Sequence, residues 1–272
     1  MRSAAYQGYP MLGMQPAQVY LYSPAYRAPR HFHPEPEINL VRRGVAVLGV
    51  GEAVVEARVG DVVFFAPGQD HVLLHGSPDL ELFTSGVSPE LLAEHDLLGS
   101  TEMLLPIRAR LSDADAASLL PLAGSLANRS APAEEIMALW EPARRARSLA
   151  ATSGEPVHEL TRRALAAIAR HPELDRASLA RLGRTCPSEI GRYFRRDVGI
   201  TLVDYRTRLR LIRFIERVDS GTSDLMSAAL EAGFGSYSQL HRTFRAVLGC
   251  SPRDFFGAER PKMQGRLEPA DD

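Results

Sequence analysis

The residues best suited to chemistry are histidines and acidic residues in the first third of the chain. His31 and His33 are separated by one residue, Glu37 follows, and His71 and His75 form a second group. Because side chains alternate between the faces of a strand, His31 and His33 would share one face of a strand that contains both. Imidazole and carboxylate groups are ligands for zinc, iron, manganese, nickel or copper. The same groups could instead form hydrogen bonds in an organic-ligand pocket, or serve as structural histidines.

A second candidate set lies on two helices expected over residues 187–198 and 236–248. Once the apolar positions of each helix are set aside, the remaining side chains are mostly types that read base edges or contact phosphates in DNA. In the first helix they are Ser188, Glu189, Arg192, Arg195 and Arg196. In the second they are Tyr237, Ser238, Gln239, His241, Arg242 and Arg245. We expect these side chains to bind DNA.

The elements that would carry these side chains are repeated along the chain. A shift of 50 residues aligns residues 192–195 (Arg-Tyr-Phe-Arg) with residues 242–245 (Arg-Thr-Phe-Arg), and Gly199 with Gly249. Each copy predicts a short helix, a turn, a second helix and a glycine stop, which together form a helix-turn-helix. A long helix that opens at Thr201 would connect the two copies.

Local signals support the boundaries of these helices. Asp175 and Ser236 are suited to cap helix N-termini, and Pro187 suits the first position of a helix. Gly183 and Gly233, also 50 residues apart, are predicted to end the first helix of each copy. The buried stripes of the second helices are predicted to be Ile190, Phe194 and Val198, and Leu240, Phe244 and Val247.

The N-terminal half has a different pattern. Short β-prone runs broken by glycine-containing turns occupy Val19 to Val87, which favours a sandwich or small barrel. Helical signals follow from Ser88, with segments at about 112–127 and 133–150. The predicted domains are an arm over 1–18, a barrel over 19–87, a helical linker or dimerisation region over 88–151, a DNA-binding domain over 155–258 and a tail over 259–272.

Three segments near the C-terminus carry a family resemblance. They are residues 232–236 (Ala-Gly-Phe-Gly-Ser), residues 249–252 (Gly-Cys-Ser-Pro) and the pair Phe255-Phe256. With them, residues 171–257 resemble the DNA-binding domain of the AraC/XylS family of bacterial transcription regulators. The resemblance implies that the two recognition helices enter successive major grooves on one face of the DNA, about 34–36 Å apart.

The histidine segment carries a second resemblance. The spacing H-x-H-x3-E-x6-G ends at Gly44, and a second run leads from Gly60 to His71. These runs resemble the two motifs of cupin barrels, with Ala66 in place of the usual proline and His75 in place of the usual asparagine. The resemblance implies that the barrel brings together His31, His33, Glu37 and His71. Sensor domains of the AraC/XylS family also resemble cupins and often use these positions to hold an organic ligand.

The composition excludes several classes of protein. The 272 residues are 45% hydrophobic and 24% charged with a net charge of −1, which is typical of a soluble globular chain and not of disordered, collagen-like or coiled-coil proteins. No apolar run approaches the roughly 20 residues that span a bilayer. Two cysteines cannot build a disulfide framework, so we expect a cytoplasmic protein.

The resulting hypothesis is an α+β multidomain regulator with a cupin-like barrel, flanking helices and an all-α domain of two helix-turn-helix units. By resemblance it activates transcription and senses a small-molecule effector, such as a sugar or other carbon source, and it is not an enzyme. The alternative is a metal-dependent cupin enzyme, a dioxygenase or isomerase, fused to a DNA-binding unit. Expected partners are promoter double-stranded DNA, the effector and RNA polymerase; a homodimer stays open, and no membrane is expected. The only cofactor considered is a divalent metal, namely Zn, Ni, Mn or Fe.

Overall fold

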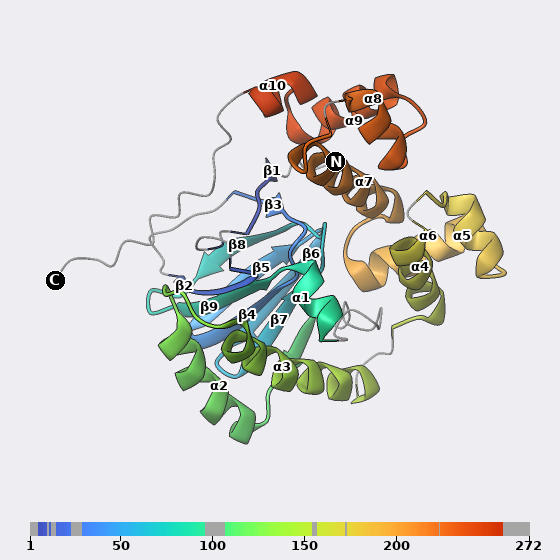
Figure 1. The fold of residues 1–272 in the computed structure, drawn as a ribbon. Coiled ribbons are helices and arrows are strands. Elements are labelled where there is room, and N and C mark those ends of the chain that lie inside the picture. The colour runs from blue at the N-terminus through green and yellow to red at the C-terminus, as the bar shows by residue number, and fades with distance from the viewer. Residues whose placement is uncertain are drawn as a thin grey trace.

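The chain folds into a β-rich N-terminal domain and an all-helical C-terminal domain, as Figure 1 shows. This computed structural model describes residues 5–9, 11, 15–22, 29–95, 107–153, 157–171, 173–222 and 224–257. The architecture confirms the predicted α+β organisation. The tail expected over 259–272 lies outside the described residues. Within the described ranges, no helix combines the length and apolar character needed to cross a membrane.

Two five-stranded sheets form the N-terminal domain, in the orders β1-β3-β8-β5-β6 and β10-β7-β4-β9-β2. Every strand pair is antiparallel except β1 with β3. The strands are β1 (Ala5–Tyr6), β2 (Ala17–Tyr22), β3 (His31–Phe32), β4 (Glu37–Arg43), β5 (Val45–Val50), β6 (Ala53–Arg58), β7 (Asp61–Phe65), β8 (His71–Gly76), β9 (Glu81–Val87) and β10 (Arg108–Arg110).

Alternation along the strands produces two separate cores. On β7, Val62 and Phe64 belong to the core under the covering helices, whereas Val63 and Phe65 belong to the core between the sheets. This division follows from the period of two in a strand. Both faces of β7 are buried. A strand of this kind appears in the sequence as a continuous apolar run.

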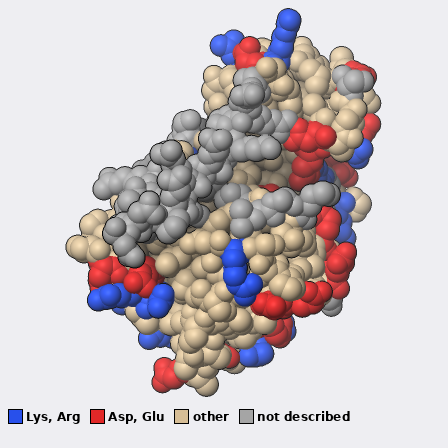
Figure 2. Space-filling model, turned by 60° about the vertical axis from the view of Figure 1, so that its left-hand side comes forward, with Lys and Arg blue, Asp and Glu red and all other residues tan. Residues whose placement is uncertain are grey.

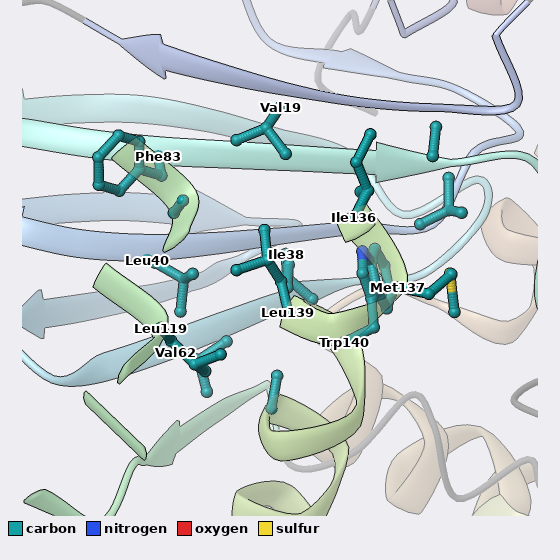
Figure 3. Close-up of a cluster of buried hydrophobic side chains, with 14 of the residues drawn as sticks. Val19, Ile38, Leu40, Val62, Phe83, Leu119, Ile136, Met137, Leu139 and Trp140 are labelled. Atoms are coloured by element: carbon teal, nitrogen blue, oxygen red, sulfur yellow. The ribbon is translucent and has the colours of Figure 1, made fainter. Parts of the chain in front are cut away.

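Three helices follow the last strand of the predicted barrel: α1 (Pro89–Glu94), α2 (Asp113–Leu126) and α3 (Ala133–Ser153). In Figure 3, Ile136, Leu139 and Trp140 of α3 lie over Ile38 and Leu40 of the sheet. These helices therefore seal the outer face of one sheet. Strand β10 departs from the helical expectation after Ser88, because it pairs with β7 and forms the edge of that sheet.

The C-terminal domain consists of two helix-turn-helix units joined by α7. The helices are α4 (Glu159–Arg170), α5 (Arg176–Leu182), α6 (Pro187–Val198), α7 (Leu202–Asp219), α8 (Leu225–Glu231), α9 (Tyr237–Leu248) and α10 (Pro252–Gly257). The predicted stripes of α6 and α9 are buried. Asp175 and Ser236 cap helices as predicted, since each accepts a hydrogen bond from a main-chain N–H of the first turn.

The turns of the two units differ by one residue. Residues 183–186 connect α5 to α6, whereas residues 232–236 connect α8 to α9. Consequently Gly233 has the left-handed φ of 89°, but its predicted counterpart Gly183 does not; the left-handed residue there is Arg184, with a φ of 51°. The glycines therefore mark the ends of the first helices as predicted, Gly183 as the C-cap of α5 and Gly233 one residue after the C-cap of α8, but they have different backbone conformations.

Charged side chains are mixed on the surface. On the face of the described residues shown in Figure 2, acidic and basic groups are interspersed over both lobes. This agrees with the near-zero net charge of the chain.

Candidate functional site

The barrel brings three of the predicted histidines together with Glu37. His31 on β3 is paired in register with His71 on β8, and His33 follows β3 directly. One ring nitrogen from each histidine lies within 4.8 Å of the others. We call His31, His33, His71 and Glu37 the imidazole cluster. Its four side chains are buried, with residue exposures between 2% and 8%.

Proline and glycine shape the backbone around the cluster. β3 ends at Phe32, and Pro34 and Pro36 follow before β4 begins. The main-chain nitrogen of proline carries no hydrogen, so these residues cannot continue the hydrogen bonds of a β-ladder. The turn before β8 returns to this segment, since the Gly68 N–H donates to the His33 carbonyl at 2.9 Å. Gly68 has a φ of 74°, a value that favours glycine.

The three imidazoles are held in the same way. In His31, His33 and His71, Nδ1 lies 2.9, 2.7 and 3.1 Å from a main-chain carbonyl two residues away. A carbonyl can only accept, so each Nδ1 carries the hydrogen. In a neutral ring this leaves Nε2 with a free lone pair, which is the arrangement of a histidine prepared to bind a metal.

Glu37 supplies the negative charge of the cluster. Its Oε2 lies 3.1 Å from His33 Nε2 and 3.6 Å from His71 Nε2. Although burial raises the pKa of Glu37, its contacts with His33 and His71 outweigh that effect and hold the pKa well below its usual range. Nε2 of His71 is buried and has no hydrogen-bond partner among the described residues.

The histidines differ in charge. Burial, reinforced by the neighbouring His71 and His33, lowers the pKa of His31 to about 3, so this ring is neutral. Burial also acts to lower the pKa of His33, but the hydrogen bond and charge of Glu37, together with Glu35, raise the pKa overall. In the absence of a ligand, Glu37 therefore favours the protonated form of His33.

His75 is not part of the cluster. It lies near the end of β8 and is exposed. The sequence prediction that grouped it with the other four residues is therefore wrong about its position. The sequence spacing of His71 and His75 could not reveal that His75 is exposed. The pairing of β8 with β5 has a register irregularity at the point where His75 pairs with Val47.

Two aromatic residues also lie against the cluster, neither of them among the predicted site residues. Phe65 is stacked on His71 with ring centroids 4.2 Å apart, and Tyr9 meets His33 edge-on at 5.9 Å. The alternation of β7 could have indicated Phe65. The position of Tyr9 depends on Gly86, where an added Cβ would lie 2.4 Å from its ring.

The first of the predicted DNA-reading helices, α6, presents most of its candidate residues to solvent. Ser188, Arg192, Arg195 and Arg196 are exposed. Glu189 is half-buried and accepts a hydrogen bond from Thr185 Oγ1. This bond ties the Glu189 carboxylate to the turn that precedes its own helix.

The second helix, α9, is similar. Ser238, Gln239, Arg242 and Arg245 are exposed, whereas Tyr237 and His241 are half-buried with their rings 6.3 Å apart. Gln239 Oε1 accepts a hydrogen bond from the Gly235 N–H at 2.8 Å. Gln239 and Glu189 thus each accept a hydrogen bond from the turn that precedes their own helix.

A buried charge cluster joins the barrel to the C-terminal domain. Asp70, next to His71, accepts hydrogen bonds from Arg30 at 2.7 Å and from Arg208 of α7. Burial acts to raise the pKa of Asp70, but Arg208 and Arg30 outweigh it and lower that pKa. The sequence offered no signal for this contact, because Asp70 and Arg208 are 138 residues apart.

Comparisons with known proteins match both domains. Residues 19–153 match the model of the AraC-like ligand binding domain, and residues 179–258 match that of a helix-turn-helix domain. No curated protein matches the chain with significant similarity.

Solved structures are similar at low identity. ToxT from Vibrio cholerae is 13% identical, with a TM-score of 0.47, over 89% of this chain and 97% of its own. The C-terminal domain of AraT, a response regulator from Geobacillus stearothermophilus, is 19% identical, with a TM-score of 0.36, over 42% of this chain and 97% of its own. The plu4264 protein from Photorhabdus luminescens is 19% identical, with a TM-score of 0.26, over 29% of this chain and 69% of its own.

Proposed function

Because this chain belongs to the AraC/XylS family of transcription regulators, we propose that its two helix-turn-helix units read adjacent major grooves while its barrel responds to a ligand at the imidazole cluster. The chain is a DNA-binding regulator with a ligand-binding domain, and not an enzyme. The alternative of a cupin enzyme is accordingly set aside.

The proposed base readers are the exposed candidates near the start of each recognition helix. These are Ser188 and Arg192 in α6 and Ser238 and Arg242 in α9. In a helix-turn-helix, the N-terminal residues of the second helix reach the base edges. We assign phosphate contacts to Arg195, Arg196 and Arg245, which lie further along the helices. The remaining candidates have partners within the protein, as described above, and we propose that they make secondary contacts with DNA. They are Glu189, Tyr237, Gln239 and His241.

The ligand that the cluster suits best is a divalent transition-metal ion of the Zn, Ni, Mn or Fe class. The observation that carries this proposal is the common arrangement of the three imidazoles, each fixed through Nδ1, so that Nε2 is the ligand atom once His33 gives up its hydrogen bond to Glu37. Glu37 adds a carboxylate. A bound metal would act as a Lewis acid held by these four side chains, and it would replace the proton on His33.

Burial favours an ion over the sugar or other carbon source considered from the sequence. The His31 and His71 rings have centroids 4.4 Å apart, and those of His33 and His71 are 5.0 Å apart. Rings at this separation are in contact, so a sugar ring cannot lie between them. An organic effector bound elsewhere in the barrel is an outcome that the experiment below distinguishes.

Other parts of the proposal rest on family membership alone. They are activation of transcription, contact with RNA polymerase, pairing of two chains through the helices after the barrel, and action in the cytoplasm. The domain boundaries predicted from the sequence also stay proposals, with β10 placed in the barrel sheet.

The metal proposal is tested on the full chain after treatment with a chelator. Stoichiometric binding of Zn²⁺ is expected by calorimetry, and Co²⁺ is expected to produce absorption bands of a low-symmetry site with nitrogen ligands. His71→Ala removes one ligand and should weaken binding at least tenfold, on the scale of lost contacts around a metal.

His75→Ala is the matched control, because it removes the same side chain from an exposed position on the same strand. It should leave metal affinity unchanged. Equal losses in both variants would mean that metal binds at the surface. If neither variant nor the parent binds metal, but a small organic acid or sugar raises the Tm, the barrel holds an organic effector and the metal proposal fails.

A further inference from the structure

The turn between β5 and β6 packs against the end of the first recognition helix. Gly51 in this turn has a φ of 56°, and an added Cβ would lie 2.2 Å from Ile200 and 2.3 Å from the Gly199 carbonyl oxygen. In the other direction, an added Cβ on Gly199 would lie 2.8 Å from the Val50 carbonyl oxygen. The two backbones therefore meet at a distance that requires glycine on both sides.

Polar contacts reinforce this approach. The Glu52 N–H donates to the Gly199 carbonyl at 2.7 Å, and Gln69 Nε2 donates to the Val198 carbonyl at 2.8 Å. Carbonyls at the end of a helix lack partners inside the helix, so the barrel supplies donors that the helix end needs. Gln69 is 1% exposed, which places this contact inside the interface.

An ion pair extends the contact onto the DNA-reading side of α6. Arg195 Nε lies 2.8 Å from Glu52 Oε2. Glu52 and Ala53 also line a groove of about 650 Å³ together with Ser188 and Arg192 of α6. The turn thus stands beside the face of α6 that carries the proposed base readers, and it places a carboxylate against an arginine assigned to a DNA phosphate.

We propose that Gly51, Glu52 and Gln69 form an autoinhibitory clasp that holds the C-terminal end of the first recognition helix and keeps Arg195 from DNA. The duplex cannot use Arg195 while Glu52 holds it, because a phosphate and a carboxylate compete for the same guanidinium. Contact between Arg195 and a DNA phosphate therefore requires Glu52 to release the guanidinium group. The clasp rests on the DNA-reading role proposed above for α6, and it adds a closed state that the sensor barrel itself maintains.

The clasp is connected to the imidazole cluster through one short segment. The Gln69 carbonyl bonds to Nδ1 of His71, while the Gln69 side chain bonds to the end of α6. Asp70, which lies between Gln69 and His71 in the sequence, accepts hydrogen bonds from Arg30 and Arg208. Arg30 also donates a hydrogen bond to the Gly51 carbonyl. A ligand that repositions His71 therefore acts on the residue that holds the recognition helix.

The test compares Glu52→Gln with Glu56→Gln in the full chain. Both variants remove one negative charge, and Glu56 pairs with Arg58 on β6 rather than with the C-terminal domain. The probe is a labelled duplex of about 30 bp, long enough for two successive major grooves, selected by the parent chain from a randomised library. Glu52→Gln should bind it about two- to fivefold more tightly than Glu56→Gln, the range expected for losing an exposed ion pair.

Salt dependence gives a second DNA readout. Release of Arg195 for one more phosphate should steepen the dependence of log K on log salt by about 0.9 in Glu52→Gln. Equal affinities and equal slopes for Glu52→Gln and Glu56→Gln would overturn the clasp.

A third readout needs no DNA. Amide hydrogen exchange of residues 50–53 reports the Glu52–Gly199 hydrogen bond directly and should be faster in Glu52→Gln than in Glu56→Gln. If no variant binds any duplex, the proposed reading function fails, while faster exchange still supports the closed contact. Unchanged exchange would mean that Glu52 does not hold the interface.

Discussion

Asp70 of the barrel and Arg208 of α7 form an ion pair across the boundary between the two domains, with side-chain exposures of 3% and 5%. Arg30 contacts the same carboxylate. Two guanidinium groups thus share one buried acid, and only one of them belongs to the barrel. The position of α7 against the sensor is set by a charge contact and not by apolar packing alone.

Asp70→Ala should therefore lower the free energy of unfolding by about 3–5 kcal/mol, since it leaves the buried Arg208 without its carboxylate. Urea denaturation of the full chain measures this. Asp79→Ala is the control, because Asp79 pairs with Arg43 at the surface and an exposed pair contributes about 0–1 kcal/mol. A small effect of Asp70→Ala, comparable to that of the control, would contradict the buried role.

Removing the charge of the cluster should have a pH-dependent effect on the metal-free protein. The lowered pKa of Glu37 stabilises the fold above its ordinary value of 4.5, and this stabilisation is lost as the pH falls. The raised pKa of His33 stabilises the fold below its ordinary value of 6.5, and this is lost as the pH rises through the raised value.

The difference in stability between the parent and Glu37→Gln should consequently be largest between about pH 4.5 and 6.5. Denaturation curves with a chelator present, recorded from pH 4 to 9, measure the difference. A constant difference over the whole range would show that Glu37 and His33 do not form a charged pair.

Arg242→Ala should relax base preference at one position of the bound site. Arginine binds guanine through two hydrogen bonds, and losing this contact costs about 1–3 kcal/mol of discrimination. Selection of DNA from a randomised library by parent and variant measures the preference at every position. An unchanged preference, with uniformly weaker binding, would reassign Arg242 to phosphate contact.

Arg196→Ala should have the opposite signature. In the structure this side chain lies over the Tyr193 ring and pairs with Asp197, away from the start of α6. We expect all sequences to be bound more weakly by a similar factor, and the salt slope to fall by about 0.9. Titrations at several salt concentrations test this, and a loss confined to some sequences would show base reading.

The sequence predicted the helix-turn-helix units well because their signals are local. Capping residues such as Ser236, the proline at the start of α6 and the four-residue spacing of Phe194 with Ile190 act within one or two turns. The turn of the first unit was less predictable. A connection that is shorter by one residue places Arg184, and not Gly183, in the left-handed conformation.

The ligand site was only partly predictable. The resemblance to cupin motifs implied that His31 and His71 meet, but the exclusion of His75 depends on a register irregularity between strands. Phe65 could have been inferred from alternation, whereas Tyr9 lies in an arm without a periodic pattern that would fix its position. The contacts between domains could not be predicted at all, since Glu52 and Arg195 are 143 residues apart and neither has a distinctive neighbourhood in the sequence.

Both recognition helices end at a left-handed glycine with φ near 79°, yet the two glycines have different surroundings. Gly199 is pressed against the barrel, whereas a Cβ at Gly249 would meet nothing within 4 Å among the described residues. Two units with the same pattern of helices and glycines therefore differ in how closely the barrel approaches them. Such a regulator would first bind DNA through its second unit alone. It would bind a full site only when the first unit is released. The ligand would then change the dwell time at the promoter more than the rate of arrival.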